Sequence, residues 1–95
     1  MKGGWVYILT NRVFGTLFTG VTNDIIRRVG EHREGRGSRF ATKYRLTRLV
    51  YFEWHEDIES AIARETRLKH WPRRWKLNLI EAQNPGWADL YGSLF

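Results

Sequence analysis

Five features of this sequence carry groups suited to phosphodiester chemistry: Tyr7, the triplet Phe18-Thr19-Gly20, Arg28, His32 and Glu65. They combine a phenol, a glycine turn, a cation, an imidazole and a carboxylate. Such a set could activate water, hold a phosphate and hold a metal ion, which are the tasks involved in cutting a phosphodiester. Whether they can act together depends on the elements that position them.

The pattern of apolar residues and turn signals predicts a three-stranded antiparallel sheet flanked by helices. Two apolar runs joined by turn residues indicate a hairpin, and a third run is rich in β-branched and aromatic residues. Helix caps are predicted at Thr22–Asp24 and Asp57, and Pro72 suits a first helical turn. The predicted fold class is α+β, and the predicted order of elements along the chain is ββαβαα. The expected strands are 5–9, 16–21 and 48–54, and the expected helices are 24–33, 57–70 and 72–82, with a helical turn at 40–44 and a tail over 87–95.

The 95 residues suit one domain, spanning 1–95. No cysteine is present, so neither a disulfide framework nor a thiolate metal site is available. No apolar stretch approaches the roughly 20 residues that a membrane-spanning helix needs. A soluble, cytoplasmic protein without a membrane partner is therefore expected.

The net charge of +6 is concentrated in two segments, 25–48 and 64–76. Most of the basic residues are arginines, whose planar fork suits phosphate groups. A nucleic acid is the expected partner, DNA rather than RNA, although a solvated basic surface explains charge alone equally well. The residues expected to contact the backbone are Arg27, Arg33, Arg36, Arg39 and Lys43.

Glu65 gives the strongest signal from the residues themselves. At 100° per residue it lies about 20° from Ile58, within the predicted inward face of its helix. A carboxylate there costs free energy unless it is paired, hydrogen-bonded or bound to a metal. Two interpretations stay open: a structural salt bridge, for example to Arg28, or a single oxygen ligand for Mg²⁺. The other members of the predicted inward face are Ile58, Ala61, Ile62 and Leu68.

The remaining candidates depend on spacing along their elements. Arg28 and His32 are four residues apart, so they share one helix face and could stabilise phosphoryl charge and orient water. Tyr7 and Phe18 can be neighbours across the hairpin. A phenol becomes a plausible base only beside a cation or a metal. An ordinary surface pair and ordinary core packing are the alternatives.

These motifs together resemble the GIY-YIG nuclease superfamily, and most of all its small stand-alone bacterial UPF0213-type proteins. The resemblance covers nearly the whole chain, from Trp5 to Tyr91. Its motifs are Trp5-Val6-Tyr7, Phe18-Thr19-Gly20, the run from Asn23 to His32, the run from Arg64 to Lys76, and Asn84-Pro85-Gly86-Trp87.

The resemblance implies a ββαβα core and metal-dependent phosphodiester hydrolysis, with Tyr7, Arg28, His32 and Glu65 as catalytic residues and Glu65 as the metal ligand. Trp5 replaces the glycine of the first motif. More seriously, Phe18 stands where the second motif has tyrosine. The family's downstream asparagine corresponds to either Asn78 or Asn84.

The sequence therefore predicts an endonuclease acting on DNA, single-stranded or structured, with one Mg²⁺ or Mn²⁺. Glu65 would hold the metal, Arg28 would stabilise charge, and Tyr7 with His32 would position or deprotonate water. One alternative is a nucleic-acid-binding module that has lost catalysis through Phe18. Another is a structural interaction protein with an incidental basic surface.

Overall fold

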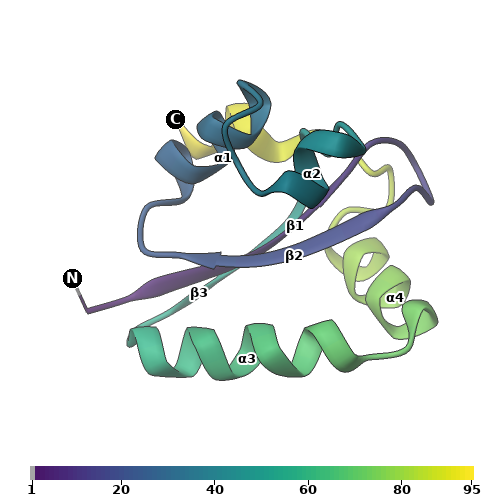
Figure 1. Ribbon diagram of the computed structural model, residues 1–95. Helices are drawn as coiled ribbons and strands as arrows, with labels where there is room; N and C mark the ends of the chain where they lie inside the picture. The colour runs from purple at the N-terminus through teal and green to yellow at the C-terminus, as the bar shows by residue number, and fades with distance from the viewer. Residues whose placement is uncertain (1) are drawn as a thin grey trace.

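Strand β1 (Gly4–Thr10) is the centre of a three-stranded sheet in the order β2-β1-β3, with both pairs antiparallel. The computed structural model describes residues 2–95. Helices cover both faces of the sheet (Figure 1). This confirms the predicted α+β fold. The other elements are β2 (Leu17–Thr22), α1 (Ile25–Arg33), α2 (Arg39–Lys43), β3 (Arg48–His55), α3 (Ile58–His70), α4 (Arg73–Gln83) and the 3₁₀ helix η1 (Leu90–Leu94).

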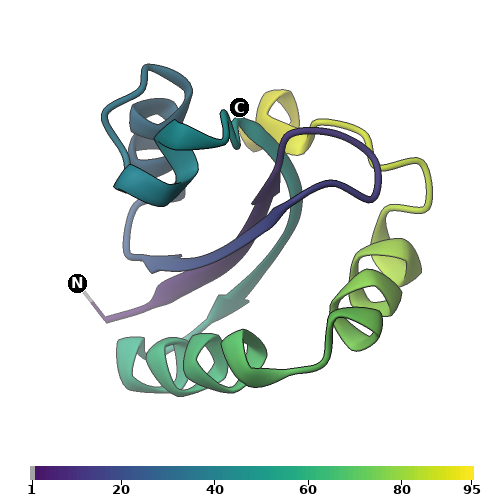
Figure 2. The same cartoon turned by 45° about the vertical axis from the view of Figure 1, so that its right-hand side comes forward.

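The alternation of side chains along β1 divides the core between the two faces of the sheet. Tyr7 and Leu9 pack with Ile25 and Val29 of α1. Val6 packs instead with residues of α3, and Ile8 packs with residues near α4. Figure 2 shows α3 and α4 forming a continuous layer along one side, while α1 and α2 lie on the other. Residues of α1 and α3 therefore approach the sheet from opposite faces.

The helix starts follow the predicted caps, with one shift. The Asp24 carboxylate accepts a hydrogen bond from the backbone amide of Arg27, and the Asp57 carboxylate accepts one from Ser60. Asp24 is thus the cap itself rather than part of the first turn. On α3, Ala61, Glu65 and Leu68 are buried as predicted. Ile62 was predicted to face inward but is 47% exposed, because it lies beside the sheet-facing stripe.

The C-terminal segment was predicted as a tail, but it is an integral part of the fold. Trp87 is 1% exposed in the core formed with Ile8 and Ile80. The Asp89 carboxylate accepts a hydrogen bond from the Leu49 amide. Such long-range contacts carry no local periodicity, so the sequence pattern did not reveal them. Within residues 2–95, none of the helices is long and apolar enough to cross a membrane.

Candidate active site

The buried pair of Tyr7 and His32 forms the centre of the candidate site. The Tyr7 hydroxyl lies 3.0 Å from Nε2 of His32. Tyr7 comes from the central strand and is 1% exposed, while His32 comes from the last turn of α1 and is 3% exposed. Because Arg28 lies one helical turn before His32, the arginine occupies the same face of α1. The structure therefore brings together three of the four predicted catalytic residues.

Two glycines allow this pair to form. Gly20 lies directly opposite Tyr7 across the β1–β2 pair, and a methyl group there would lie 2.4 Å from Cζ of the Tyr7 ring. A methyl group on Gly37 would lie 2.1 Å from Nδ1 of His32. Any side chain at either position would displace the ring beside it. Gly20 therefore permits close packing of the Tyr7 ring on β2, and Gly37 fixes the loop after α1 against the imidazole.

Arg28 is held at the site by an acidic neighbour. Its Nη1 donates to Oε1 of Glu31 at 3.0 Å, and the other Glu31 oxygen accepts from Arg27 at the same distance. Glu31 raises the pKa of Arg28, so the guanidinium stays charged. Tyr7 is almost fully covered in this arrangement. A phosphate that binds Arg28 must compete with the Glu31 carboxylate and displace the side chains that cover the phenol.

Burial keeps both central residues neutral. Burial raises the pKa of Tyr7 above its usual value, the positive charge of Arg28 opposes that rise, and the negative charge of Glu65 adds to it. Burial also lowers the pKa of His32 to about 4, with the Arg28 charge acting in the same direction. Nδ1 of His32 is buried and, among the residues described, has no hydrogen-bond partner. The site at neutral pH thus holds a phenol bonded to an uncharged imidazole.

This burial predicts a pH dependence of stability. An unfolded histidine binds a proton near pH 6.5, whereas folded His32 resists protonation down to about pH 4. Between these values the unfolded chain binds more protons, so the free energy of unfolding falls as the pH is lowered. Urea unfolding between about pH 6.5 and 5, above the range where carboxyl groups titrate, measures this slope. His32→Gln should flatten it, and an unchanged slope in that variant would contradict the assignment.

Glu65 lies on the opposite side of the sheet from α1. It is 9% exposed, and its Oε2 lies 2.6 Å from Nζ of Lys69 on the same helix. The predicted salt bridge exists, but its partner is Lys69 and not Arg28, which is bonded to Glu31. Glu65 nonetheless acts on Tyr7 through its charge. The positive charge of Arg28 therefore acts on the phenol from one side of the sheet, and the negative charge of Glu65 acts on it from the other.

The donor groups at Glu65 fit a hydrated divalent cation. Across residues 2–95, no group of three or more His, Cys, Asp or Glu side chains could hold a metal together. Mg²⁺ commonly takes only one or two protein carboxylates and keeps its waters or binds substrate phosphates. Lys69 already balances the Glu65 charge, and its half-exposed, flexible side chain can move away. Glu65 is thus suited to be a single protein ligand.

The other two positions of the family motifs, Phe18 and the downstream asparagine, lie in different surroundings. The Phe18 ring is half-buried beside the central pair, with its centroid 5.3 Å from that of His32 and 6.3 Å from that of Tyr7. Asn84 is buried, and its amide group bonds the backbone of Val50 and Ala88. That asparagine holds the C-terminal segment in place. Asn78 is exposed on α4.

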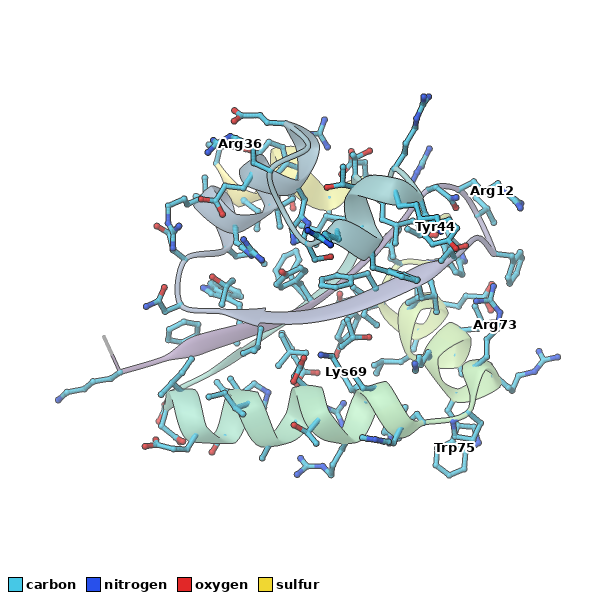
Figure 3. All side chains as sticks on the ribbon, in the orientation of Figure 1. Arg12, Arg36, Tyr44, Lys69, Arg73 and Trp75 are labelled. Carbon is cyan, nitrogen blue, oxygen red and sulfur yellow. The ribbon has the colours of Figure 1, made fainter. Side chains whose placement is uncertain are left out.

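The predicted backbone-binding residues fall into two classes. Arg33 is used within the fold: its guanidinium bonds Asp89 at 2.7 Å and lies over the Tyr91 ring. Arg36 pairs with Glu34 in the exposed loop. Arg39 is exposed, and among the residues described it forms no salt bridge. Figure 3 shows Arg36 at the outer end of the loop after α1. Four of the predicted cations are exposed and placed to meet a ligand: Arg27, Arg36, Arg39 and Lys43.

Three contacts at the site were not predicted. The Arg28–Glu31 and Glu65–Lys69 pairs have i,i+3 and i,i+4 spacing, so the helical pattern could have revealed them. The packing of Gly37 on His32 has no comparable signal, because it depends on how the loop after α1 folds back.

The sequence profile described as the GIY-YIG catalytic domain matches residues 3–78 of the chain. The chain belongs to the GIY-YIG family. The matched segment contains all four predicted catalytic residues and the glycine opposite Tyr7. GIY-YIG is a nuclease family, and its domain implies an interaction with nucleic acid.

Relatives of this GIY-YIG chain are UPF0213 proteins. One from Desulfotalea psychrophila is 33% identical over 91 residues, which cover 95% of this chain and 83% of the relative. One from Staphylococcus aureus strain Mu3 is 37% identical over 67 residues, 70% of this chain and 82% of the relative. The solution NMR structure of a UPF0213 protein from Bacillus halodurans superimposes with a TM-score of 0.56 at 29% identity, covering 92% of each chain. These matches confirm the predicted family and fold.

Proposed function

We propose that this GIY-YIG domain is a metal-dependent endonuclease that hydrolyses phosphodiester bonds in single-stranded or structured DNA. The observation that carries the proposal is the buried Tyr7–His32 hydrogen bond, with Arg28 and Glu65 both acting on the same phenol. A structural protein has little use for a buried phenol and imidazole with opposite charges acting on the phenol from the two sides of the sheet. Perturbed titratable groups gathered in this way are typical of active sites.

Each residue has a role that follows from its surroundings. Arg28 exchanges Glu31 for a phosphate oxygen and neutralises the charge that builds there. His32, neutral and fixed by Gly37, holds the Tyr7 hydroxyl. Tyr7 orients the attacking water, or takes the proton of that water while passing its own phenolic proton to Nε2 of His32. Glu65 would hold Mg²⁺ or Mn²⁺, which supplies charge neutralisation and acidifies water when bound.

Cleavage assays test the proposal directly. Labelled single-stranded, hairpin and duplex DNA of equal length, with a matched RNA strand, are incubated with the protein and Mg²⁺ or Mn²⁺. We expect internal cuts in unpaired or structured DNA that EDTA prevents. Binding without cleavage in either metal would favour the second candidate function, a binding module impaired by Phe18. No binding to any of these nucleic acids would overturn both.

Binding itself is expected to depend strongly on salt. Each phosphate neutralised on a single strand should contribute about −0.7 to the slope of log K against log salt. Arg39→Ala should weaken binding and make that slope shallower without unfolding the domain, since Arg39 is exposed. Fluorescence anisotropy across a salt series measures both effects. Lys2→Ala, which removes an exposed lysine outside the predicted binding residues, is the control. An affinity that hardly changes with salt would contradict the prediction.

A further inference from the structure

The junction of α3 and α4 carries an exposed tryptophan within a basic surface. Trp75 lies in the first turn of α4 and is 54% exposed. Figure 3 shows its ring extending away from the body of the protein. A large indole left half in water forgoes part of the free energy gained by burial. This position is therefore a candidate contact site.

The Trp75 side chain is supported by a chain of contacts. Its ring meets the Trp71 ring edge to face, with centroids 5.6 Å apart and an interplanar angle of 79°. The Arg64 guanidinium lies 5.1 Å from the centroid of Trp71. Nε of Arg64 in turn donates to Glu53 of β3 at 3.0 Å. The exposed indole is thus linked to the sheet, and holding it in place costs little entropy when a ligand binds.

The sequence on both sides of Trp75 is basic and lacks acidic residues. From Thr66 to Ile80 the chain contains five Lys or Arg residues and no Asp or Glu. Arg73 is used to hold the β1–β2 turn, donating to the carbonyl oxygens of Phe14 and Gly15. Arg67 and Arg74 are exposed, and within residues 2–95 neither forms a salt bridge. These two cations remain available to an anionic ligand.

We propose that an unpaired nucleic-acid strand leaves the Tyr7–Arg28–Glu65 site across this junction, with one base stacked on Trp75 and backbone phosphates contacting Arg67 and Arg74. Lys69, which pairs with Glu65, lies one helical turn closer to the junction, so α3 leads from Glu65 towards Trp75. The inference rests on the proposed function and deepens it by naming the form of the substrate.

The chemistry favours a single strand over other polyanions. An aromatic ring beside arginines matches the alternation of bases and phosphates in a flexible strand. In a duplex the base faces are already stacked on one another and offer no free face to an indole. An acidic peptide would satisfy the arginines but would leave the exposed Trp75 ring unexplained.

The test compares Trp75→Ala with Trp54→Ala. Trp54 is 48% exposed but belongs to β3, where it packs against Trp5. Fluorescence anisotropy is measured with a labelled oligothymidylate strand and with a duplex of equal length. Trp75→Ala should weaken single-strand binding about five- to a hundredfold, the range for loss of one stacked base, and leave duplex binding unchanged. Trp54→Ala should leave both unchanged. Trp75→Phe should restore most of the affinity.

Charge at the junction is tested separately with Arg74→Ala, which should reduce the magnitude of the salt slope by about 0.7, while Lys2→Ala leaves it unchanged. Equal losses from Trp75→Ala and Trp54→Ala would overturn the proposal, as would unchanged single-strand binding in Trp75→Ala. The proposal would also be overturned if polyglutamate bound as tightly as the single strand and Trp75→Ala weakened that binding. If the unmodified protein binds neither strand nor duplex, the proposed function itself fails. If it binds the strand and Trp75→Ala leaves that binding unchanged, only this inference fails.

Discussion

Glu65→Gln is expected to reduce metal-dependent cleavage by at least about a hundredfold while leaving nucleic-acid binding intact. Losing one preorganised electrostatic group at a reacting centre typically costs about 10²- to 10³-fold in rate. Glutamine keeps the shape of the side chain but removes the charge that a divalent cation requires. Binding should persist because the substitution removes a negative charge from a surface that attracts a polyanion. Single-turnover cleavage and anisotropy on the same labelled strand measure the two effects.

The matched control for that variant is Glu59→Gln, an exposed carboxylate in the first turn of the same helix. Its cleavage rate should equal that of the unmodified protein. Thermal unfolding of both variants shows whether the loss of the Glu65–Lys69 pair alters the fold. Cleavage by Glu65→Gln at the unmodified rate, with the same metal requirement, would exclude Glu65 as the metal ligand.

The order of elements could be predicted because each is specified locally. Asp24 and Asp57 cap the helices that follow them, and the sheet strands are short runs of apolar residues between turn signals. The burial of Glu65 was also predictable, since the helical period alone places it on the face of Ala61 and Leu68. Periodicity failed for Ile62, which lies at the margin of that face and is exposed.

The contacts across the site could be predicted only in part. The hairpin predicted that Tyr7 and Phe18 are neighbours, and their ring centroids do lie 6.3 Å apart. The residue directly opposite Tyr7, however, is Gly20. That register depends on where the turn closes, and a shift of one residue would place Tyr7 on the other face. The hydrogen bond to His32 depends in addition on how α1 packs over the sheet. Neither feature has a local signature in the sequence.

The charged residues show the same limit. Composition placed a cluster of arginines near the site, but it could not separate those that bind the protein itself from those that face solvent. Arg33 is used to anchor the C-terminal segment through Asp89, and Arg73 holds the β1–β2 turn. Both partners are more than fifty residues away in sequence. Counting basic residues therefore overestimates the surface that is free for a nucleic acid.

Phe18→Tyr is expected to increase the cleavage rate by about tenfold or more. The substitution adds one hydroxyl to a half-buried ring that lies beside both His32 and Tyr7. General acid–base groups typically contribute about 10²- to 10⁴-fold, so a second phenol that helps to position water has room for a gain of this size. Single-turnover rates at saturating protein, with Mg²⁺ or Mn²⁺, measure it.

The unmodified protein should still cut, because Tyr7, Arg28, His32 and Glu65 are all present without the second phenol. Tyr7→Phe is the matched comparison, since it removes the other hydroxyl and leaves the His32 imidazole without its only hydrogen-bond partner among the described residues. We expect it to lose cleavage both alone and combined with Phe18→Tyr. If Phe18→Tyr cuts and the unmodified protein does not, the native site is intact but depends on the added hydroxyl. If neither the unmodified protein nor Phe18→Tyr cuts, with metal present and binding confirmed, the binding module replaces the nuclease, because restoring the hydroxyl would then have restored nothing.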